Sequence, residues 1–457
     1  MGCRCAPACE GNGNGVLAGA PGAADDAPHV RHLVEDVLKL DFRSCPEVIQ
    51  GAKVVVRADL NVPLSRDGTV LDELRVIECL PTIRALVEMG AAVVVLSHMG
   101  RPKPSKMTPD ELQRLSLAKV APIFERELGA DTFLGFRGDC LGQEARDAAA
   151  AAKPGQVVLL ENTRFHAGDE QGSEEMARQL AKLGNVFVLD AFGTCHRDHA
   201  SVSGLSRCMG PGRRFPGLLV RRECEFLVRT LGGGGSVCCV VGGAKVADKL
   251  QVLFSLVDLA SIMIVGGRMA FTFLAAQGVA VGDTVIEPDL IDDAKHILAR
   301  AKERNIPFLL PEDVVAGTSL DGGETKVLTL TAGCCTRDAP CMRSGEVGGD
   351  IGPATVARFT EAIRDCGCST LFWNGPLGRY EAEEYSRGTA AVARAVAEAT
   401  KAGVTTVVGG GDSAACLLKL GLAGSVSHLS TGGGATLEMI QGESMPGLRA
   451  LAGWPIP

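Results

Sequence analysis

Three arginines in the first half of the chain are spaced in a way that points to anion chemistry. Arg101, Arg164 and Arg197 each stand a few residues after a short apolar run. If these runs are neighbouring parallel strands, the loops that carry the arginines share one edge of a sheet. Converging guanidiniums repel one another unless an anion lies between them, and the arginine fork suits phosphate and carboxylate. One arginine alone would be more typical of a solvated surface, but the three together predict a pocket for a small phosphorylated acid.

Four histidines, His98, His166, His196 and His199, lie in the same loops and raise the question of a metal site. Neighbouring arginines would repel a cation, so we do not expect metal ligation there.

Glycine-rich segments mark the second half of the chain in the same way. They follow apolar runs and precede predicted helices, at residues 242–249, 266–268, 373–378, 409–413 and 430–435. Glycine lets backbone N–H groups approach an anion, and a helix N-terminus adds favourable partial charge. None of these segments matches the Walker or the dinucleotide-binding glycine pattern. The pattern predicts a phosphate-binding surface of another kind.

Two lysines and one carboxylate stand inside these glycine segments. Lys245 and Lys249 have the i, i+4 spacing that would place both ammonium groups on one face of a helix, where an anion must compensate the dipole. Asp412 is expected at a helix N-terminus. There it is either an N-cap or a carboxylate that holds Mg²⁺ beside phosphates, and the spacing does not separate the two.

The elements that must position these residues follow from the apolar periodicity. Strands alternate with amphipathic helices on both sides of about residue 220, which predicts two α/β domains with parallel sheets covered on both faces. The expected strands are residues 53–57, 91–96, 157–160 and 186–189 in the first half. In the second half they are residues 236–241, 261–265, 307–310, 370–373, 405–408 and a run near 426–429.

Composition excludes several classes of protein. The 457 residues carry a net charge of -8, which argues against a nucleic-acid protein, and the 57 glycines follow no collagen period. Apolar runs are too short to span a bilayer. The 17 cysteines show no paired CxxC spacing, so we expect most to be reduced in a cytoplasmic protein. The tail before residue 29 lacks periodicity. Membrane contact is expected only if Gly2 and Cys3 are lipidated.

Ordered segments of the chain resemble the motifs of phosphoglycerate kinase. They are residues 54–63, 97–103, 161–166, 190–201, 242–249, 373–381, 409–415 and 430–438. The resemblance runs from about residue 37 to Leu451 and implies two Rossmann-like domains with parallel sheets, joined by a hinge, with a C-terminal segment returning to the N-domain. The implied division is a disordered extension 1–36, an N-domain 37–218 with 440–457 returning to it, and a C-domain 219–439. Hinge candidates are residues 217–225 and 431–443.

The resemblance also implies the activity, which is reversible phosphoryl transfer between ATP and the carboxylate of 3-phosphoglycerate. The products are ADP and 1,3-bisphosphoglycerate, Mg²⁺ accompanies the nucleotide, and the chain is expected to be a monomer. The residues implied to bind the acid are Asp59, Asn61, Arg75, His98, Arg101, Arg164 and Arg197. Those implied to bind the nucleotide are Gly243, Ala244, Lys245, Lys249, Gly267, Gly348, Asn374, Pro376, Glu381, Gly409, Gly410, Gly411, Asp412 and Ser413. Within these sets Asp412 would hold Mg²⁺, Glu381 the ribose, and Arg75, Lys245, Gly410 and Gly411 would act in catalysis.

Three departures from the family pattern lie in or next to the segments implied to bind the nucleotide. Arg268 replaces a usual glycine, Arg379 replaces a small apolar residue, and residues 334–348 differ from the usual stretch. Two alternatives stay open at this point. One is a kinase of another small phosphorylated acid, and the other is an inactive scaffold protein tethered through its tail.

Overall fold

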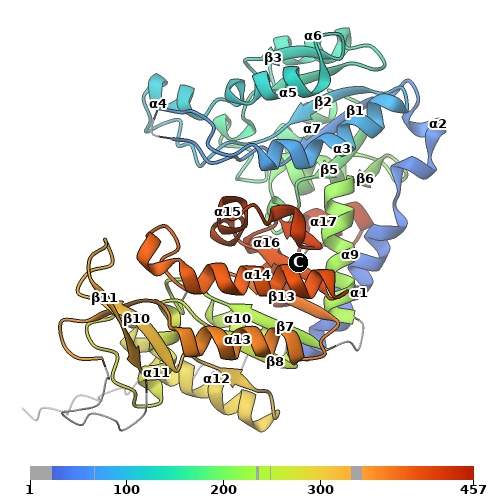
Figure 1. The fold of residues 1–457 in the computed structure, drawn as a ribbon. Coiled ribbons are helices and arrows are strands. Elements are labelled where there is room, and N and C mark those ends of the chain that lie inside the picture. Colours follow the sequence, from blue (N-terminus) through green and yellow to red (C-terminus); the bar gives the residue numbers. More distant parts are fainter. Residues whose placement is uncertain (1–22, 66, 233–235, 248, 331–341, 457) are drawn as a thin grey trace, which may run out of the picture.

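The computed structural model describes residues 23–65, 67–232, 236–247, 249–330 and 342–456. These residues form two lobes (Figure 1), each built on a six-stranded parallel sheet. The N-lobe sheet has the order β3-β4-β2-β1-β5-β6, and the C-lobe sheet has the order β15-β14-β13-β7-β8-β9. The expected α/β class with two parallel-sheet domains is therefore confirmed.

The N-lobe strands are almost continuously apolar because helices cover both faces of the sheet. In β2 and β5 every residue is buried, and in β1 only the first residue is partly exposed. The six strands are β1 Lys53–Ala58, β2 Ala92–Leu96, β3 Phe133–Arg137, β4 Val157–Leu160, β5 Val186–Asp190 and β6 Arg214–Pro216. The strand pattern predicted β1, β2, β4 and β5 but missed β3 and β6, which are edge strands with less apolar sequence.

The C-lobe sheet repeats this arrangement. Its strands are β7 Val237–Val241, β8 Ile262–Val265, β9 Phe308–Leu309, β13 Thr370–Asn374, β14 Thr405–Gly409 and β15 His428–Ser430. Each was expected within a few residues of its observed position. A second, three-stranded antiparallel sheet was not expected. It consists of β10 Asp313–Gly317, β11 Thr325–Thr329 and β12 Val347–Ile351, and the exposed residues of β11 do not show the apolar run of a buried strand.

Helices fill the connections between strands. In the N-lobe they are α2 Pro46–Ile49, α3 Leu74–Glu88, α4 Pro109–Arg114, α5 Ala121–Leu128, α6 Gln143–Ala151, α7 Glu174–Ala181 and α8 Leu205–Cys208. Short turns of helix there are η1 Phe42–Ser44, η2 Leu117–Lys119, η3 Thr163–Phe165, η4 Phe192–Thr194 and η5 Ala200–Gly204. In the C-lobe the helices are α10 Leu250–Leu259, α11 Met269–Ala276, α12 Ile291–Glu303, α13 Pro353–Asp365, α14 Arg387–Lys401, α15 Gly411–Lys419 and α16 Gly434–Ile440, with η6 Pro288–Leu290, η7 Glu383–Tyr385 and η8 Ala423–Ser425.

The lobes are joined by helix α9, Leu218–Gly232, which runs from one to the other in Figure 1. The final helix α17, Pro446–Ala452, returns to the N-lobe, as expected for the C-terminal segment. The Gly447 backbone N–H donates to Cys195 O at 2.9 Å, and Arg214 Nε donates to Leu451 O at 3.0 Å. The chain therefore closes its N-lobe with residues from both ends of its sequence.

Part of the predicted disordered extension is helical. Helix α1 covers Ala23–Lys39, and its Val30, Leu33, Val34 and Val37 are buried in the core cluster that also includes residues of α9 and α17. The expectation of disorder therefore fails from residue 23 on, because this stretch has an apolar face that other helices cover. Residues 1–22, with the lipidation expected at Gly2 and Cys3, lie outside the described residues. No helix within the described ranges is long and apolar enough to cross a membrane.

Candidate active site

The polar loops of the N-lobe share one edge of its sheet. Strands β4, β2, β1 and β5 are consecutive neighbours and parallel, so the loops after their carboxyl ends lie side by side. These loops carry all but one of the residues implied to bind the acid, namely Asp59, Asn61, His98, Arg101, Arg164 and Arg197. Arg75 comes from the first turn of α3. The shared sheet edge expected from the sequence is confirmed.

Four guanidinium groups surround the buried His98. Burial is the largest cause that holds the pKa of His98 well below its usual value, and the charges of Arg57, Arg164, Arg75 and Arg197 lower it further. Arg57 Nη2 lies 3.2 Å from His98 Nδ1. Arginine can only donate, so Nδ1 accepts, and the proton of the neutral imidazole resides on Nε2. The site is a basic pocket whose central histidine is uncharged.

Asp59 and Asn61 position neighbouring groups in this pocket. The buried carboxylate of Asp59 forms a close ion pair with Arg75 Nη1. The Asn61 side-chain oxygen accepts a hydrogen bond of 2.7 Å from the Gly100 backbone N–H, which ties the loop after β1 to the loop after β2. Asp59 and Asn61 therefore hold groups of the basic pocket in place before any ligand binds.

Arg164 and Arg101 differ in how firmly they are held. Arg164 is buried, donates from Nη1 to Gly100 O at 2.7 Å and pairs through Nε with Glu170 at 3.2 Å. Its burial lowers its pKa to about 10, and the carboxylate of Glu170 opposes that change. Arg101 is exposed, and none of the described residues forms a hydrogen bond or ion pair with its side chain.

Arg57 was missed by the sequence analysis, which assigned it only to a strand. Its side chain is fully buried, with Nε donating to Ser201 Oγ at 3.0 Å and Nη1 donating to Ala58 O at 2.6 Å. A charged residue inside an otherwise apolar strand was the available signal, because such a residue is buried only with partners.

His196 and His199 are also neutral. Burial and the charges of Arg197 and Arg164 lower the pKa of His196 to about 4, and burial lowers that of His199 to about 4 as well. Arg197 Nε donates to His196 Nε2 at 3.0 Å. Among the described residues, these two histidines and His98 belong to no group of three possible metal ligands, whereas His166, for which no metal was expected either, lies in one with Asp139 and Cys140.

The C-lobe contributes a cavity of about 440 Å³ at the carboxyl ends of its strands. Seven of the residues implied to bind the nucleotide line it, namely Gly243, Ala244, Gly267, Gly348, Pro376, Glu381 and Asp412. Lys245, Lys249, Asn374, Gly409, Gly410, Gly411 and Ser413 are not part of its lining. They stand at the ends of the same strands, in the loops that follow them, or at the start of α10 and α15.

Close packing between loops explains several of the glycines. Gly375 has φ +95°, and a Cβ there would collide with the backbone oxygen of Gly242 and with Lys249 Nζ. Gly267 has φ +68°, and a Cβ there would lie 2.7 Å from Gly243 N. Backbones at this distance admit no side chain, so the packing of these strand ends requires glycine at both positions, and the N–H groups of Gly375 and Gly267 donate to Ser413 Oγ and Leu377 O.

The expectation that Lys245 and Lys249 share a helix face is wrong. Helix α10 begins at Leu250 with Lys249 as its N-cap, and Lys245 stands earlier, exposed in the preceding loop. Lys249 Nζ donates to the backbone oxygens of Gly242 and Asn374, the latter at 3.0 Å. The i, i+4 spacing failed because the glycine segment continues as a loop, and Lys249 holds two strand ends together.

Asp412 lies in the first turn of α15, and the N-cap is Gly410 with φ +91°. The N-cap reading of Asp412 is therefore wrong. The carboxylate is exposed and lines the cavity. An exposed carboxylate beside accessible backbone N–H groups suits Mg²⁺, which takes one or two carboxylates and completes its shell with phosphate oxygens and water.

Eleven lining residues lie outside the implied set, and four of them bear on the chemistry of the cavity. Phe271 packs against Gly348, where a Cβ would collide with its ring, and provides an apolar wall. Asp350 is buried and accepts from Gly388 N at 2.6 Å, and burial raises its pKa to about 7. Two departures from the family pattern also line the cavity. Arg268 Nε donates to Ala244 O at 2.9 Å, and Arg379 pairs with Asp321 at 2.9 Å. Of the third departure, residues 334–341 lie outside the described residues.

The N-lobe pocket meets the C-lobe at helix α16. His196 Nε2 lies 3.8 Å from Glu438 Oε1, which is a contact and no ion pair while His196 is neutral. Figure 1 shows α15 and α16 on the side of the C-lobe that faces the N-lobe. The basic pocket and the glycine-rich loops thus belong to surfaces that face each other.

Comparisons with known proteins agree with this architecture. The sequence model of the family described as phosphoglycerate kinase matches residues 47–443. A curated phosphoglycerate kinase of Chlorobium phaeobacteroides is 40% identical over 403 residues, covering 88% of this chain and 97% of that protein. The chloroplastic phosphoglycerate kinase 2 of Arabidopsis thaliana is 40% identical over 405 residues, covering 88% and 80%. The structure of phosphoglycerate kinase from Coxiella burnetii superposes with a TM-score of 0.74 at 35% identity, covering 89% of this chain and 97% of that one.

Proposed function

This chain belongs to the phosphoglycerate kinase family and catalyses reversible phosphoryl transfer between ATP and 3-phosphoglycerate, and we propose that the transfer takes place between the basic pocket of the N-lobe and the glycine-rich loops of the C-lobe. The observation that carries this assignment of the site is the group of four guanidiniums around neutral His98. Asp59 and Glu170 balance only part of this positive charge, and 3-phosphoglycerate brings a phosphate and a carboxylate that suit the remaining guanidiniums.

On the acid side, the buried residues select and orient the substrate. Arg164 and Arg197 bind its charged oxygens, and exposed Arg101 adds a contact when the acid arrives. His98 donates from Nε2 without adding charge, because Nδ1 already accepts from Arg57. Asp59 and Asn61 accept from the substrate hydroxyl and hold Arg75 and Gly100 in place.

On the nucleotide side, backbone N–H groups bind the phosphates. Gly243 and Ala244 bind along the cavity, which Gly267 lines while its own N–H donates to Leu377 O, and they are joined by Gly409 at the end of β14 and by Gly410 and Gly411 at the start of α15. The base lies toward Phe271 and Gly348, and Glu381 accepts from the ribose hydroxyls. Lys249, Asn374, Pro376 and Ser413 fix the loops; for example, Ser413 Oγ accepts from Gly375 N at 2.7 Å.

The transfer itself needs positioning and charge neutralisation more than proton chemistry. The substrate carboxylate is already a nucleophile at neutral pH, so no general base is required. Arg75 and Lys245 approach the transferring phosphoryl group, and the N–H groups of Gly410 and Gly411 bind its oxygens. Asp412 is the residue that would hold Mg²⁺, which supplies further neutralisation of the nucleotide phosphates.

A coupled assay with 3-phosphoglycerate tests the assignment of the acid. We expect ATP-dependent turnover with 3-phosphoglycerate, and far less with a phosphorylated acid that lacks the hydroxyl or with glycerate, which lacks the phosphate. Equal turnover with these acids would contradict selection by the basic pocket and would favour a kinase of another small acid.

Closure of the two lobes is part of the proposal, because substrates bound to separate lobes must meet. The candidate hinge residues lie at the junction. Glu223 of α9 is buried and accepts from Ser430 Oγ at 2.9 Å and from Thr431 N at 3.0 Å. Small-angle X-ray scattering with both substrates should show a smaller radius of gyration than either substrate alone gives. Scattering that is unchanged would contradict closure.

Location and assembly complete the proposal. We assign the chain to the cytoplasm as a monomer, on the basis of the free cysteines among the described residues and a site built within one chain. Tethering through Gly2 and Cys3 stays a prediction, which intact-mass measurement of the expressed protein tests.

A further inference from the structure

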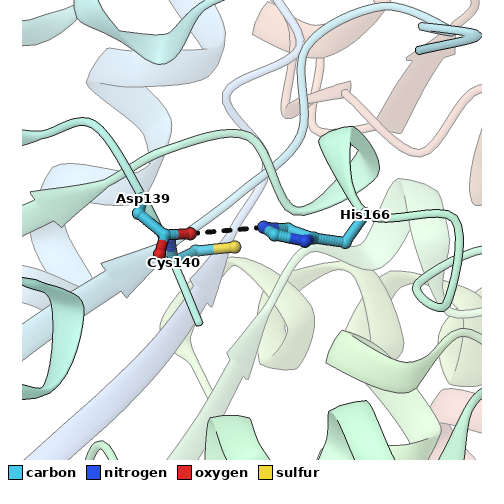
Figure 2. Close-up of side chains that lie close together, drawn as sticks. All are labelled: Asp139, Cys140 and His166. Carbon is cyan, nitrogen blue, oxygen red and sulfur yellow. Dashed lines mark hydrogen bonds and ion pairs between the residues drawn. The ribbon is translucent and has the colours of Figure 1, made fainter. Parts of the chain in front are cut away.

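Three side chains behind the basic pocket converge without taking part in the proposed reaction. Asp139 and Cys140 stand in the loop after β3, and His166 follows η3. Their ligand atoms, a carboxylate oxygen, a thiol sulfur and a ring nitrogen, all lie within 4.8 Å of one another. Figure 2 shows the sulfur of Cys140 and the carboxylate of Asp139 both directed at the imidazole of His166. Three such groups around one point are the donor set of a transition-metal ion.

The loop after β3 fixes this geometry without a metal. Asp139 Oδ1 accepts from the backbone N–H groups of Cys140 at 2.7 Å and Leu141 at 3.1 Å, and Oδ2 accepts from Gly142 N at 2.5 Å. His166 Nε2 lies 3.3 Å from Asp139 Oδ1. Because the carboxylate is already oriented, an ion would order few additional groups.

The electrostatic surroundings differ from those of the neighbouring arginine pocket. Cys140 is buried, and burial together with the carboxylates of Asp139, Asp169 and Glu161 raises the pKa of its thiol. Those negative charges oppose a free thiolate and favour a bound cation that would compensate it. Asp139 and His166 are partly exposed, so an ion could reach the buried sulfur from solvent.

We propose that Asp139, Cys140 and His166 form a binding site for one divalent transition-metal ion of the zinc class. Thiolate and imidazole ligands favour Zn²⁺ and Co²⁺ over Mg²⁺, so the site is distinct from the one assigned to Asp412. Three protein ligands leave the fourth tetrahedral position to water. On binding, the metal–sulfur bond forms as the Cys140 thiol loses its proton to solvent, so one proton is released per ion.

The site would connect two loops that already meet in the contact of 3.3 Å between His166 Nε2 and Asp139 Oδ1. His166 stands two residues after Arg164, and Asp139 and Cys140 precede α6. A bound ion would therefore tie the loop after β3 to the turn that carries a substrate-binding arginine. The proposal does not depend on the proposed reaction, since its ligands lie outside the residues assigned to either substrate.

Titration of the reduced full-length chain with Co²⁺ tests the site. We expect a thiolate-to-cobalt charge-transfer band in the near ultraviolet that saturates at one ion per chain, with one proton released. Cys140→Ser should abolish the band. His166→Gln should weaken Co²⁺ binding at least about tenfold, since loss even of groups behind metal ligands costs that much. The matched control is Cys208→Ser, which removes an exposed thiol outside the cluster and should keep the band.

Results that support the metal site can be distinguished from results that overturn it. Absence of the band in the wild-type chain, or its persistence in Cys140→Ser, would overturn the proposal and leave Asp139 and His166 as a hydrogen-bonded pair that stabilises the loop. Circular dichroism of the metal-free variants shows whether they are folded. If Cys140→Ser is unfolded, the partly exposed His166→Gln decides, and Co²⁺ binding of wild-type strength in that variant overturns the site.

Discussion

The two lobes offer different kinds of anion-binding surface for the proposed reaction. The N-lobe uses side chains, and the guanidiniums near neutral His98 are buried or partly buried, with Arg57, Arg75 and Arg164 oriented by ion pairs and by hydrogen bonds to the protein. The C-lobe relies more on its backbone, where glycines let strand ends pack closely around the cavity. A compact acid with charge at both ends suits fixed guanidiniums. A long polyphosphate suits a row of amide donors that cost little to reorganise.

The largest effect that we expect is a fall in the rate of the chemical step when the N-lobe loses the guanidinium of Arg75. Arg75→Ala removes a charge that we place at the transferring phosphoryl group, and arginines in that role contribute about 10³–10⁵ in rate. We expect kcat to fall by at least about 10³-fold in the coupled assay, with a smaller change in KM. Arg75→Lys keeps the charge and should recover part of the loss. A change confined to KM would remove Arg75 from the chemical step.

Lys245→Ala tests whether a side-chain charge of the C-lobe also contributes to the chemical step. Lys245 is exposed in its loop, and we expect it to swing onto the phosphates when the nucleotide binds. A fall in kcat comparable to that of Arg75→Ala would show that both lobes neutralise charge with side chains. Unchanged kcat would mean that the C-lobe relies on its backbone alone.

Gly375→Ala should damage the C-lobe surface through packing. Gly375 and Gly403 have nearly the same φ, +95° and +96°, so alanine pays a similar backbone penalty of about 1–3 kcal/mol at either position. Only at Gly375 does the new Cβ also meet the backbone of Gly242, whereas nothing lies within 4 Å at Gly403. We therefore expect Gly375→Ala to raise KM for ATP and lower the free energy of unfolding more than Gly403→Ala does. Equal effects would refute the packing argument.

Two groups, one in each lobe, should respond to acid with opposite signs. The pKa of His196 is lowered to about 4, so between pH 7 and pH 5 the unfolded chain takes up a proton that the folded chain does not, and stability falls. The pKa of Asp350 is raised to about 7, so over the same range the folded chain takes up the proton, and stability rises. Each contribution is about 2 kcal/mol.

Urea unfolding at pH 7 and pH 5 measures these contributions. His196→Gln should lose less stability on acidification than the wild-type chain, and Asp350→Asn should lose more. If both variants follow the wild-type difference between the two pH values, the two buried groups do not titrate as their surroundings indicate.

The smallest effect expected concerns two arginines of the same pocket. Arg164 is buried and held by Gly100 O and Glu170, whereas Arg101 is exposed. Loss of a charged hydrogen bond costs about 1.5–3 kcal/mol, so Arg164→Ala should raise KM for 3-phosphoglycerate about a hundredfold. Arg101→Ala should raise it about tenfold, because its side chain must first be ordered. The reverse order would show that an oriented guanidinium is not the better ligand.

Comparison of the expected and observed elements shows where sequence reasoning is reliable. Buried central strands appear in the sequence as apolar runs. The bounds of β1, β2, β5, β7 and β13 were therefore predicted to within a residue or two. The N-lobe edge strands β3 and β6 and the antiparallel sheet of β10–β12 were missed, because partly exposed strands carry mixed sequences, whereas the C-lobe edge strands β9 and β15 were located from short apolar runs. Helix α1 lies outside the matched segment 47–443, and it was missed although its buried Val30, Leu33, Val34 and Val37 have the i, i+3, i+4, i+7 spacing of an amphipathic helix.

By itself, the sequence determined the two-domain α/β class, the family and the types of residue at the ends of the strands. These follow from local periodicity and from short motifs that keep their order along the chain. Tertiary structure alone decided that Arg57 supports His98, that Lys249 joins two strand ends instead of sharing a helix face with Lys245, and that Asp139, Cys140 and His166 converge. Each of these contacts joins residues from different elements. Such contacts depend on how the elements pack together, and no periodic pattern in the sequence indicates them.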